Sequence, residues 1–167
     1  MQESALFFMN LSGNKDLLQG ELVAFFASRN SEPQALELAQ KWAQEISQSE
    51  KIVISGFHSP IERAVLDILL SNGCSVVVAL GRSLYKKIPS FLIEAYENNR
   101  VLFISFRDYA RPSLSNSQLR NWAVADLANE IVFAPFPESS QLSTLYFSLS
   151  RGKNNLKRLR GKRKEER

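Results

Sequence analysis

Short runs of apolar residues alternate along the chain with longer segments in which apolar residues recur at helical spacing. The runs of strand length are residues 5–9, 21–27, 51–55, 74–80, 101–106 and 130–134. The segments with helical spacing are residues 32–48, 59–72, 89–98, 115–129 and 139–150. Strands that are apolar throughout are typical of a sheet buried on both faces. The alternation therefore predicts an α/β protein with a Rossmann-like, doubly wound, mainly parallel sheet and helices on both faces.

Several helix boundaries carry local signals. Ser31 and Gln34 have the spacing of a capping box, with Pro33 in the first turn, and Ser59 and Glu62 repeat that arrangement around Pro60. In the helix predicted after residue 115, we expect a buried apolar stripe. Its members are Leu119, Trp122, Ala123 and Leu127.

Polar and basic residues gather in the segments that follow the predicted strands. Ligands of doubly wound sheets bind at the carboxyl ends of the strands, and helix N-termini beside arginines are suited to phosphate. The candidates at this edge are Ser28, Arg29, Ser55, Gly56, His58 and Arg82. A basic rim is predicted from Arg82, Lys86, Lys87, Arg107 and Arg111, and base stacking is weighed for Phe57, Tyr85 and Tyr109. For Phe57 a place in the core is favoured.

Charge divides the 167-residue chain into two parts. Residues 151–167 hold nine Lys or Arg and two Glu, a net charge of +7, whereas the whole chain carries +4. No Pro-, Gly- or Ser-rich linker precedes residue 150, so we expect one domain over 1–150 and a basic tail over 151–167. The tail has too little apolar content to fold alone. It is interpreted either as a cationic arm that holds phosphates or as a solubilising end.

Composition excludes several classes of protein. One cysteine, Cys74, and one histidine, His58, exclude an internal disulfide and make a metal site unexpected. No run of eighteen apolar residues and no signal-peptide pattern is present, so no membrane partner and a cytoplasmic location are expected. Neither a P-loop nor a G-x-G-x-x-G follows any strand, and no cofactor is expected.

The turns also follow a recognisable order. The segments are Ser12-Gly13-Asn14, Leu17-Leu18, Ala27-Ser28-Arg29, Ile52-Val53-Ile54-Ser55-Gly56-Phe57 and the helix that starts Arg120-Asn121-Trp122. In this order and spacing, over about residues 10–150, the chain resembles the DNA-processing protein A (DprA/Smf) family. The matching family segments are Gly-Asn, Leu-Leu, Gly-Ser-Arg, Val-Val-Ser-Gly-Leu-Ala and Arg-Asn-Arg. Ser140 falls where the family has the serine of Ser-Gly-Thr.

The resemblance implies a binding protein for single-stranded DNA rather than an enzyme. Arg29 would contact a phosphate, Ser55 and Gly56 would shape a turn at the strand, Arg120 would supply a second cation, and Asn121 would orient Arg120 or bond to sugar or base. The implied partners are single-stranded DNA, with RNA or a nucleotide as alternatives, and a recombinase. A homodimer stays open.

Two other functions stay open. Ser59 and Trp122 stand where the family carries arginines, and no segment of the sequence is expected to form the family's final strand. A protein that has kept the fold and lost the ligand site would explain these departures. An enzyme or sensor for a nucleotide-like molecule, related to the phosphoribohydrolases, is the other alternative. Residues 135–140 contain no glycine, which disfavours close approach of the backbone to a phosphate there.

Overall fold

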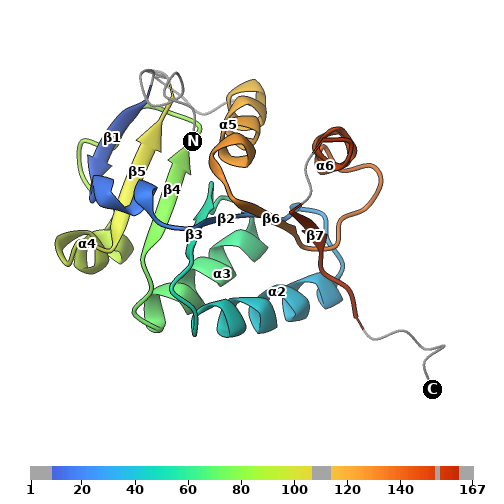
Figure 1. The fold of residues 1–167 in the computed structure, drawn as a ribbon, viewed down its shortest axis with the longest axis horizontal. Helices are drawn as coiled ribbons and strands as arrows, with labels where there is room; N and C mark the ends of the chain where they lie inside the picture. Colours follow the sequence, from blue (N-terminus) through green and yellow to red (C-terminus); the bar gives the residue numbers. More distant parts are fainter. Residues whose placement is uncertain (1–8, 107–113, 153–154, 162–167) are drawn as a thin grey trace.

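A computed structural model describes residues 9–106, 114–152 and 155–161, which form a seven-stranded sheet flanked by helices (Figure 1). The strands are β1 (Asn10–Gly13), β2 (Leu22–Phe26), β3 (Ile52–Ser55), β4 (Val76–Leu80), β5 (Val101–Ser105), β6 (Glu130–Phe133) and β7 (Leu156–Arg158). Their order is β1-β5-β4-β3-β2-β6-β7, with β1 antiparallel to β5 and every other pair parallel. The predicted mainly parallel sheet is confirmed.

Helices cover both faces of the sheet, and the central strands are therefore buried on both sides. The helices are η1 (Lys15–Gln19), α2 (Pro33–Ile46), α3 (Pro60–Ser71), α4 (Ser90–Glu97), α5 (Leu114–Leu127) and α6 (Leu142–Ser150). In β2, Val23 and Phe25 join the cluster under α2, α3 and α4, whereas Ala24 and Phe26 join the cluster under η1, α5 and α6. Figure 1 shows α2 and α3 on one side of the sheet and α5 and α6 on the other. The doubly wound arrangement follows directly.

The two predicted capping boxes have different outcomes. The Ser59 hydroxyl accepts from the N–H of Glu62, and the Glu62 carboxylate accepts from the N–H of Ser59, so the box at α3 is confirmed. The box at α2 is wrong: the N-cap is Glu32, without a side-chain cap, and Ser31 Oγ donates to the carbonyl of Ser28. Ser31 thus closes the turn after β2 instead of capping a helix.

The buried face of α5 differs from the predicted stripe. Leu127 is buried as predicted, but Leu119 and Trp122 are 47% and 44% exposed, and Arg120 and Val124 are buried in their place. The helix is therefore rotated so that Arg120 faces inward and Trp122 faces solvent. By contrast, Trp42 in α2 is buried and stacks on Phe25, with ring centroids 4.8 Å apart.

The two ends of the sheet were the least predictable. The strand expected at 5–9 lies outside the described residues except for Met9, which is not in a strand, and the observed edge strand is β1. The expectation of a missing final strand is wrong. β7 lies inside the basic segment and pairs with β6, and the N–H of Leu159 donates to the carbonyl of Phe133. Leu159 itself is buried.

A side chain of β7 fastens that edge to the loop before α6. Arg158 Nη2 donates to the carbonyl of Phe136 at 2.7 Å, and its guanidinium lies 4.0 Å from the centre of the Phe136 ring. Within the described ranges, no helix is long and apolar enough to cross a bilayer. Arg107 and Arg111 of the predicted basic rim, and Tyr109, a candidate for base stacking, lie outside those ranges.

Candidate functional site

The order of the strands creates a switch point between β2 and β6. The chain runs outward from β2 through β3 and β4 to β5, and α5 then carries it back to β6 on the other side of β2. In doubly wound sheets the crevice at such a point, at the carboxyl ends of the strands, is where ligands bind. Here it holds a pocket of about 520 Å³.

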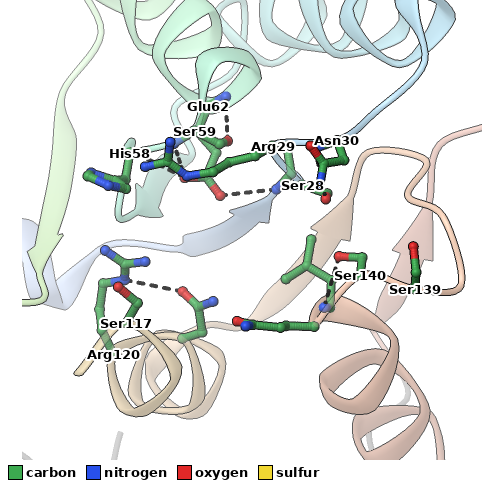
Figure 2. Close-up of a pocket in the computed structure, with 14 residues that line it drawn as sticks. Ser28, Arg29, Asn30, His58, Ser59, Glu62, Ser117, Arg120, Ser139 and Ser140 are labelled. Carbon is green, nitrogen blue, oxygen red and sulfur yellow. Dashed lines mark hydrogen bonds between the residues drawn. The ribbon is translucent and has the colours of Figure 1, made fainter. Parts of the chain in front are cut away.

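Four segments line this pocket, which we call the switch-point pocket (Figure 2). They are residues 27–30 after β2, His58, Ser59 and Glu62 at the start of α3, Ser117, Arg120 and Asn121 of α5, and residues 139–142 before and in α6. In Figure 2, Arg29 and His58 lie on one wall, and Arg120 lies on the facing wall. Two arginines and a histidine from three different parts of the sequence thus face the pocket.

Glu62 holds together the wall of the pocket that carries Arg29 and His58. Its side chain is only 6% exposed. Oε2 accepts from the N–H of Ala27 at 3.0 Å, and Oε1 accepts from the N–H groups of His58 and Ser59 at 3.0 and 3.3 Å. This carboxylate therefore joins the end of β2 to the turn after β3, and both of its oxygens are committed to the backbone. It positions the pocket walls.

Arg120 is the buried cation of the site. It is 8% exposed, its Nε donates to Asn121 Oδ1 at 3.2 Å, and no carboxylate of the described residues lies within ion-pair distance. Burial lowers the pKa of the guanidinium, and the more distant charge of Glu62 opposes that shift. A buried charge without a direct counter-ion is costly unless a ligand supplies the opposite charge. An anion in the pocket would do so.

Arg29 adds to the positive potential of the pocket, and His58 adds to it only when its imidazole is protonated. Both are exposed. Partial burial lowers the pKa of His58, the charges of Arg29 and Arg120 lower it further, and Glu62 acts in the opposite direction. Mutual repulsion among these groups would be relieved by a bound anion, because an opposite charge favours the charged form of each.

Two serine hydroxyl groups also line the pocket, and Figure 2 shows them on the side away from His58 and Arg120. Ser28 Oγ accepts from the N–H of Asn30, and Ser140 Oγ accepts from the N–H of Leu142 in the first turn of α6. Both serines line the pocket, as do Arg29, His58, Arg120 and Asn121. Six of the nine residues expected at the site are therefore brought together here.

The other three expected residues lie outside the switch-point pocket. Ser55 is fully buried, and its Oγ accepts from the N–H of Phe57 at 3.0 Å, which shapes the turn. Gly56 and Arg82 line a neighbouring pocket of about 290 Å³. Arg82 Nε donates to the carbonyl of Ser83, and its guanidinium lies 4.7 Å from the centre of the Tyr85 ring. Phe57 is buried in the core, as expected.

The two pockets are contiguous. His58, Ser117 and Arg120 line both of them. The second pocket also contains the exposed ring of Phe91, with the Arg63 guanidinium 3.5 Å from the centre of that ring. Lys86 and Lys87 are exposed and line neither pocket.

Sequence reasoning missed Ser117 and Gln141. Ser117 lies three residues before Arg120, so the helical repeat places it on the same side of α5, a signal that would have found it. Gln141 is the N-cap residue of α6 without a side-chain cap, and nothing in the sequence marks it. No group of three metal-ligating side chains occurs among the described residues.

Comparison with solved structures gives similar folds. DNA processing protein A (DprA) from Streptococcus pneumoniae aligns over 92% of this chain and 55% of its own, with a TM-score of 0.74 and 23% identity. DNA processing protein A from Helicobacter pylori aligns over 93% of this chain and 73% of its own, with a TM-score of 0.75 and 17% identity. The Moco carrier protein of Chlamydomonas rheinhardtii is more distant, with a TM-score of 0.52, 12% identity, and coverage of 84% and 76%.

A search of curated protein sequences gave no significant match. The chain spans about half the length of the pneumococcal protein, so the likeness concerns one portion of it. The sequence model of DNA recombination-mediator protein A matches residues 2–157, which includes every element from β1 to α6 and reaches into β7. The resemblance seen in the turns is thereby confirmed, and the chain belongs to the DNA recombination-mediator protein A family.

Proposed function

We propose that this protein binds single-stranded DNA, without sequence preference, along the carboxyl edge of its sheet. A phosphate of the strand occupies the switch-point pocket between Arg29, His58 and Arg120. The observation that carries the proposal is Arg120, a buried guanidinium that faces an open pocket with no carboxylate of the described residues beside it. Guanidinium groups and helix N-termini are both suited to binding a phosphate group.

We propose that the bound DNA strand continues into the neighbouring pocket. It begins at the shared Arg120 and holds Arg82 and Arg63, with the rings of Tyr85 and Phe91 beside them. Cations interleaved with aromatic rings are typical of grooves that follow a single strand. A mononucleotide would fill the first pocket alone, so length dependence separates a strand from a nucleotide ligand.

The family supports the biological role. A structure of the Helicobacter pylori protein is described by its single-stranded DNA binding mode, and the family is that of a recombination mediator. A recombinase that receives the strand is the protein partner we propose, with the cytoplasm as the place of action. The basic residues at 162–167 are proposed to add a cationic arm to the domain.

Fluorescence anisotropy with a labelled oligo-dT tests the proposal. Arg29→Gln removes an exposed cation of the pocket, and Lys41→Gln removes an exposed cation from α2, which contributes no residue to the pocket. We expect several-fold weaker binding for Arg29→Gln and near-native binding for Lys41→Gln at the same salt concentration. Equal affinities for the two variants would contradict the phosphate site. Competition with dTMP, expected to be weak, distinguishes a strand from a mononucleotide.

A further inference from the structure

Trp122 is the residue of α5 whose placement the binding proposal does not explain. Its side chain is 44% exposed, although a tryptophan that only packs is normally buried. It sits two residues after Arg120, which is buried on the sheet side of the same helix. Leu119, 47% exposed, lies one helical turn before it. α5 thus presents its cation inward and its indole outward.

A third cavity, which we call the α5–α6 groove, lies beside this indole. Its volume is about 210 Å³, and its lining side chains are Gln118, Asn121, Trp122, Gln141, Leu142, Thr144 and Leu145. A cavity of roughly 150 Å³ is enough to hold benzene, so this space is suited to a ring system somewhat larger than benzene. None of the lining side chains is charged, which disfavours a phosphate and favours a neutral, flat group.

The groove continues the switch-point pocket. Asn121, Gln141 and Leu142 line both of them. Asn121 accepts the Arg120 Nε–H on the pocket side. A strand with its phosphate at Arg120 would therefore place the adjoining base or the next one against Asn121 and the groove. This continuity is the reason to assign the occupant to the bound strand rather than to a separate protein.

Resting on the proposed function, we infer that Trp122 and the α5–α6 groove form a base-stacking subsite for one nucleobase of the bound single strand. The indole supplies the flat apolar surface, and Gln118, Gln141 and Thr144 supply donors and acceptors for any base edge. Stacking accepts every base because each has a π-face, so this subsite adds affinity without sequence preference.

Trp122→Ala and Trp122→Phe test the subsite in the full chain. Two labelled probes are used: an oligo-dT and an oligomer of the same length whose sugars carry no bases. We expect Trp122→Ala to weaken binding of oligo-dT about 5- to 140-fold, and Trp122→Phe to restore most of it. Binding of the abasic oligomer should be the same for wild type and both variants, because no base remains to stack.

Intrinsic fluorescence gives an independent readout. The chain has two tryptophans, and Trp42 is buried against Phe25. Oligo-dT should quench part of the emission of the wild type and none of the emission of Trp122→Phe, in which only Trp42 remains. Quenching that persists in Trp122→Phe would count against the subsite.

The outcomes separate the two proposals. If the wild type binds oligo-dT and Trp122→Ala binds it equally well, the subsite is refuted, the phosphate pocket survives, and the exposed indole serves a protein contact. A loss that is equal for the dT and abasic oligomers indicates a structural effect and also refutes stacking. If the wild type binds neither oligomer, the proposed function fails, and the subsite fails with it.

Discussion

Gly56 lies directly against the guanidinium of Arg120. A Cβ added to Gly56 would stand 2.5 Å from Cζ and 2.6 Å from Nη1 of that side chain, closer than real Cβ contacts. The residue directly after β3 therefore leaves the space that the guanidinium of Arg120 occupies. A Cβ at this position would require the end of the Arg120 side chain to move, and the glycine is not explained by an unusual backbone angle.

Gly56→Ala should displace Arg120 and weaken both stability and binding. Overpacking in a core costs roughly 1–3 kcal/mol, and we expect a cost at the lower end here because the end of the Arg120 side chain can shift; urea denaturation would measure it as a lower free energy of unfolding. In Arg120→Ala the space beside Gly56 is empty, so the second substitution should cost much less there. If Gly56→Ala costs the same in both backgrounds, the contact with Arg120 is not its cause. Gly152→Ala is a suitable control, because nothing lies within 4 Å of a Cβ at that position.

Glu62→Gln should destabilise the pocket walls. The amide keeps one acceptor oxygen but replaces the other with an N–H₂ donor, so at least one of the N–H groups of Ala27, His58 and Ser59 loses its partner. An unsatisfied buried donor costs about 1–3 kcal/mol. Denaturation in urea would detect this loss, and Glu37→Gln on the exposed surface of α2 should be close to neutral. Equal effects of the two substitutions would argue against the bridging role.

The pKa of His58 should make stability and ligand binding respond to pH in opposite directions. Because the folded protein holds this pKa below 6.5, the unfolded chain takes up a proton first, and the stability contributed by His58 is present above pH 6.5 and lost as the pH falls toward the folded pKa. A phosphate in the pocket favours the imidazolium, so the affinity for single-stranded DNA should rise as the pH falls over the same interval.

NMR can follow this titration without ambiguity, since His58 is the single histidine of the chain. We expect its pKa below 6.5 in the free protein and higher with oligo-dT bound. His58→Gln should remove the pH dependence of binding between about pH 5 and 7. A pKa that does not change when oligo-dT binds would place the phosphate elsewhere.

Removal of residues 162–167 should flatten the salt dependence of binding. A chain that ends at Gly161 keeps β7 and has four fewer Lys or Arg. For a single strand, the slope of log K against log salt becomes shallower by about 0.7 for each phosphate that the shortened chain no longer neutralises. An unchanged slope would show that residues 162–167 do not bind DNA.

The sequence contained enough to predict the sheet, because the central strands are buried on both faces and are therefore apolar throughout. The Ser59–Glu62 box was readable as well, since its partners are three residues apart and Pro60 reinforces the helix start. The face of α5 was not readable. A pattern rule assigns arginine to solvent, whereas the pocket places Arg120 inward and leaves Trp122 exposed. The rotation of that helix is set by a polar site, which hydrophobic periodicity does not record.

β7 was missed for a related reason. Three residues are too few for a strand period, and Lys157 and Arg158 are typical of a solvated segment. What places them in the sheet is pairing with the free edge of β6, an interaction between separate parts of the chain. The same holds for the switch-point pocket, whose four wall segments are spread over the chain from Ala27 to Leu142.

The character of β7 has a consequence for self-association. Open sheet edges recruit strands from other molecules, and natural proteins guard against this with edges that are short and charged. β7 has only three residues, two of them basic, and Arg158 is fastened to the loop before α6. A second copy of the chain that approached this edge would meet like charges, and a strand of three residues offers too few hydrogen bonds to stabilise pairing. The strand that completes the sheet also protects the protein from aggregation through that edge.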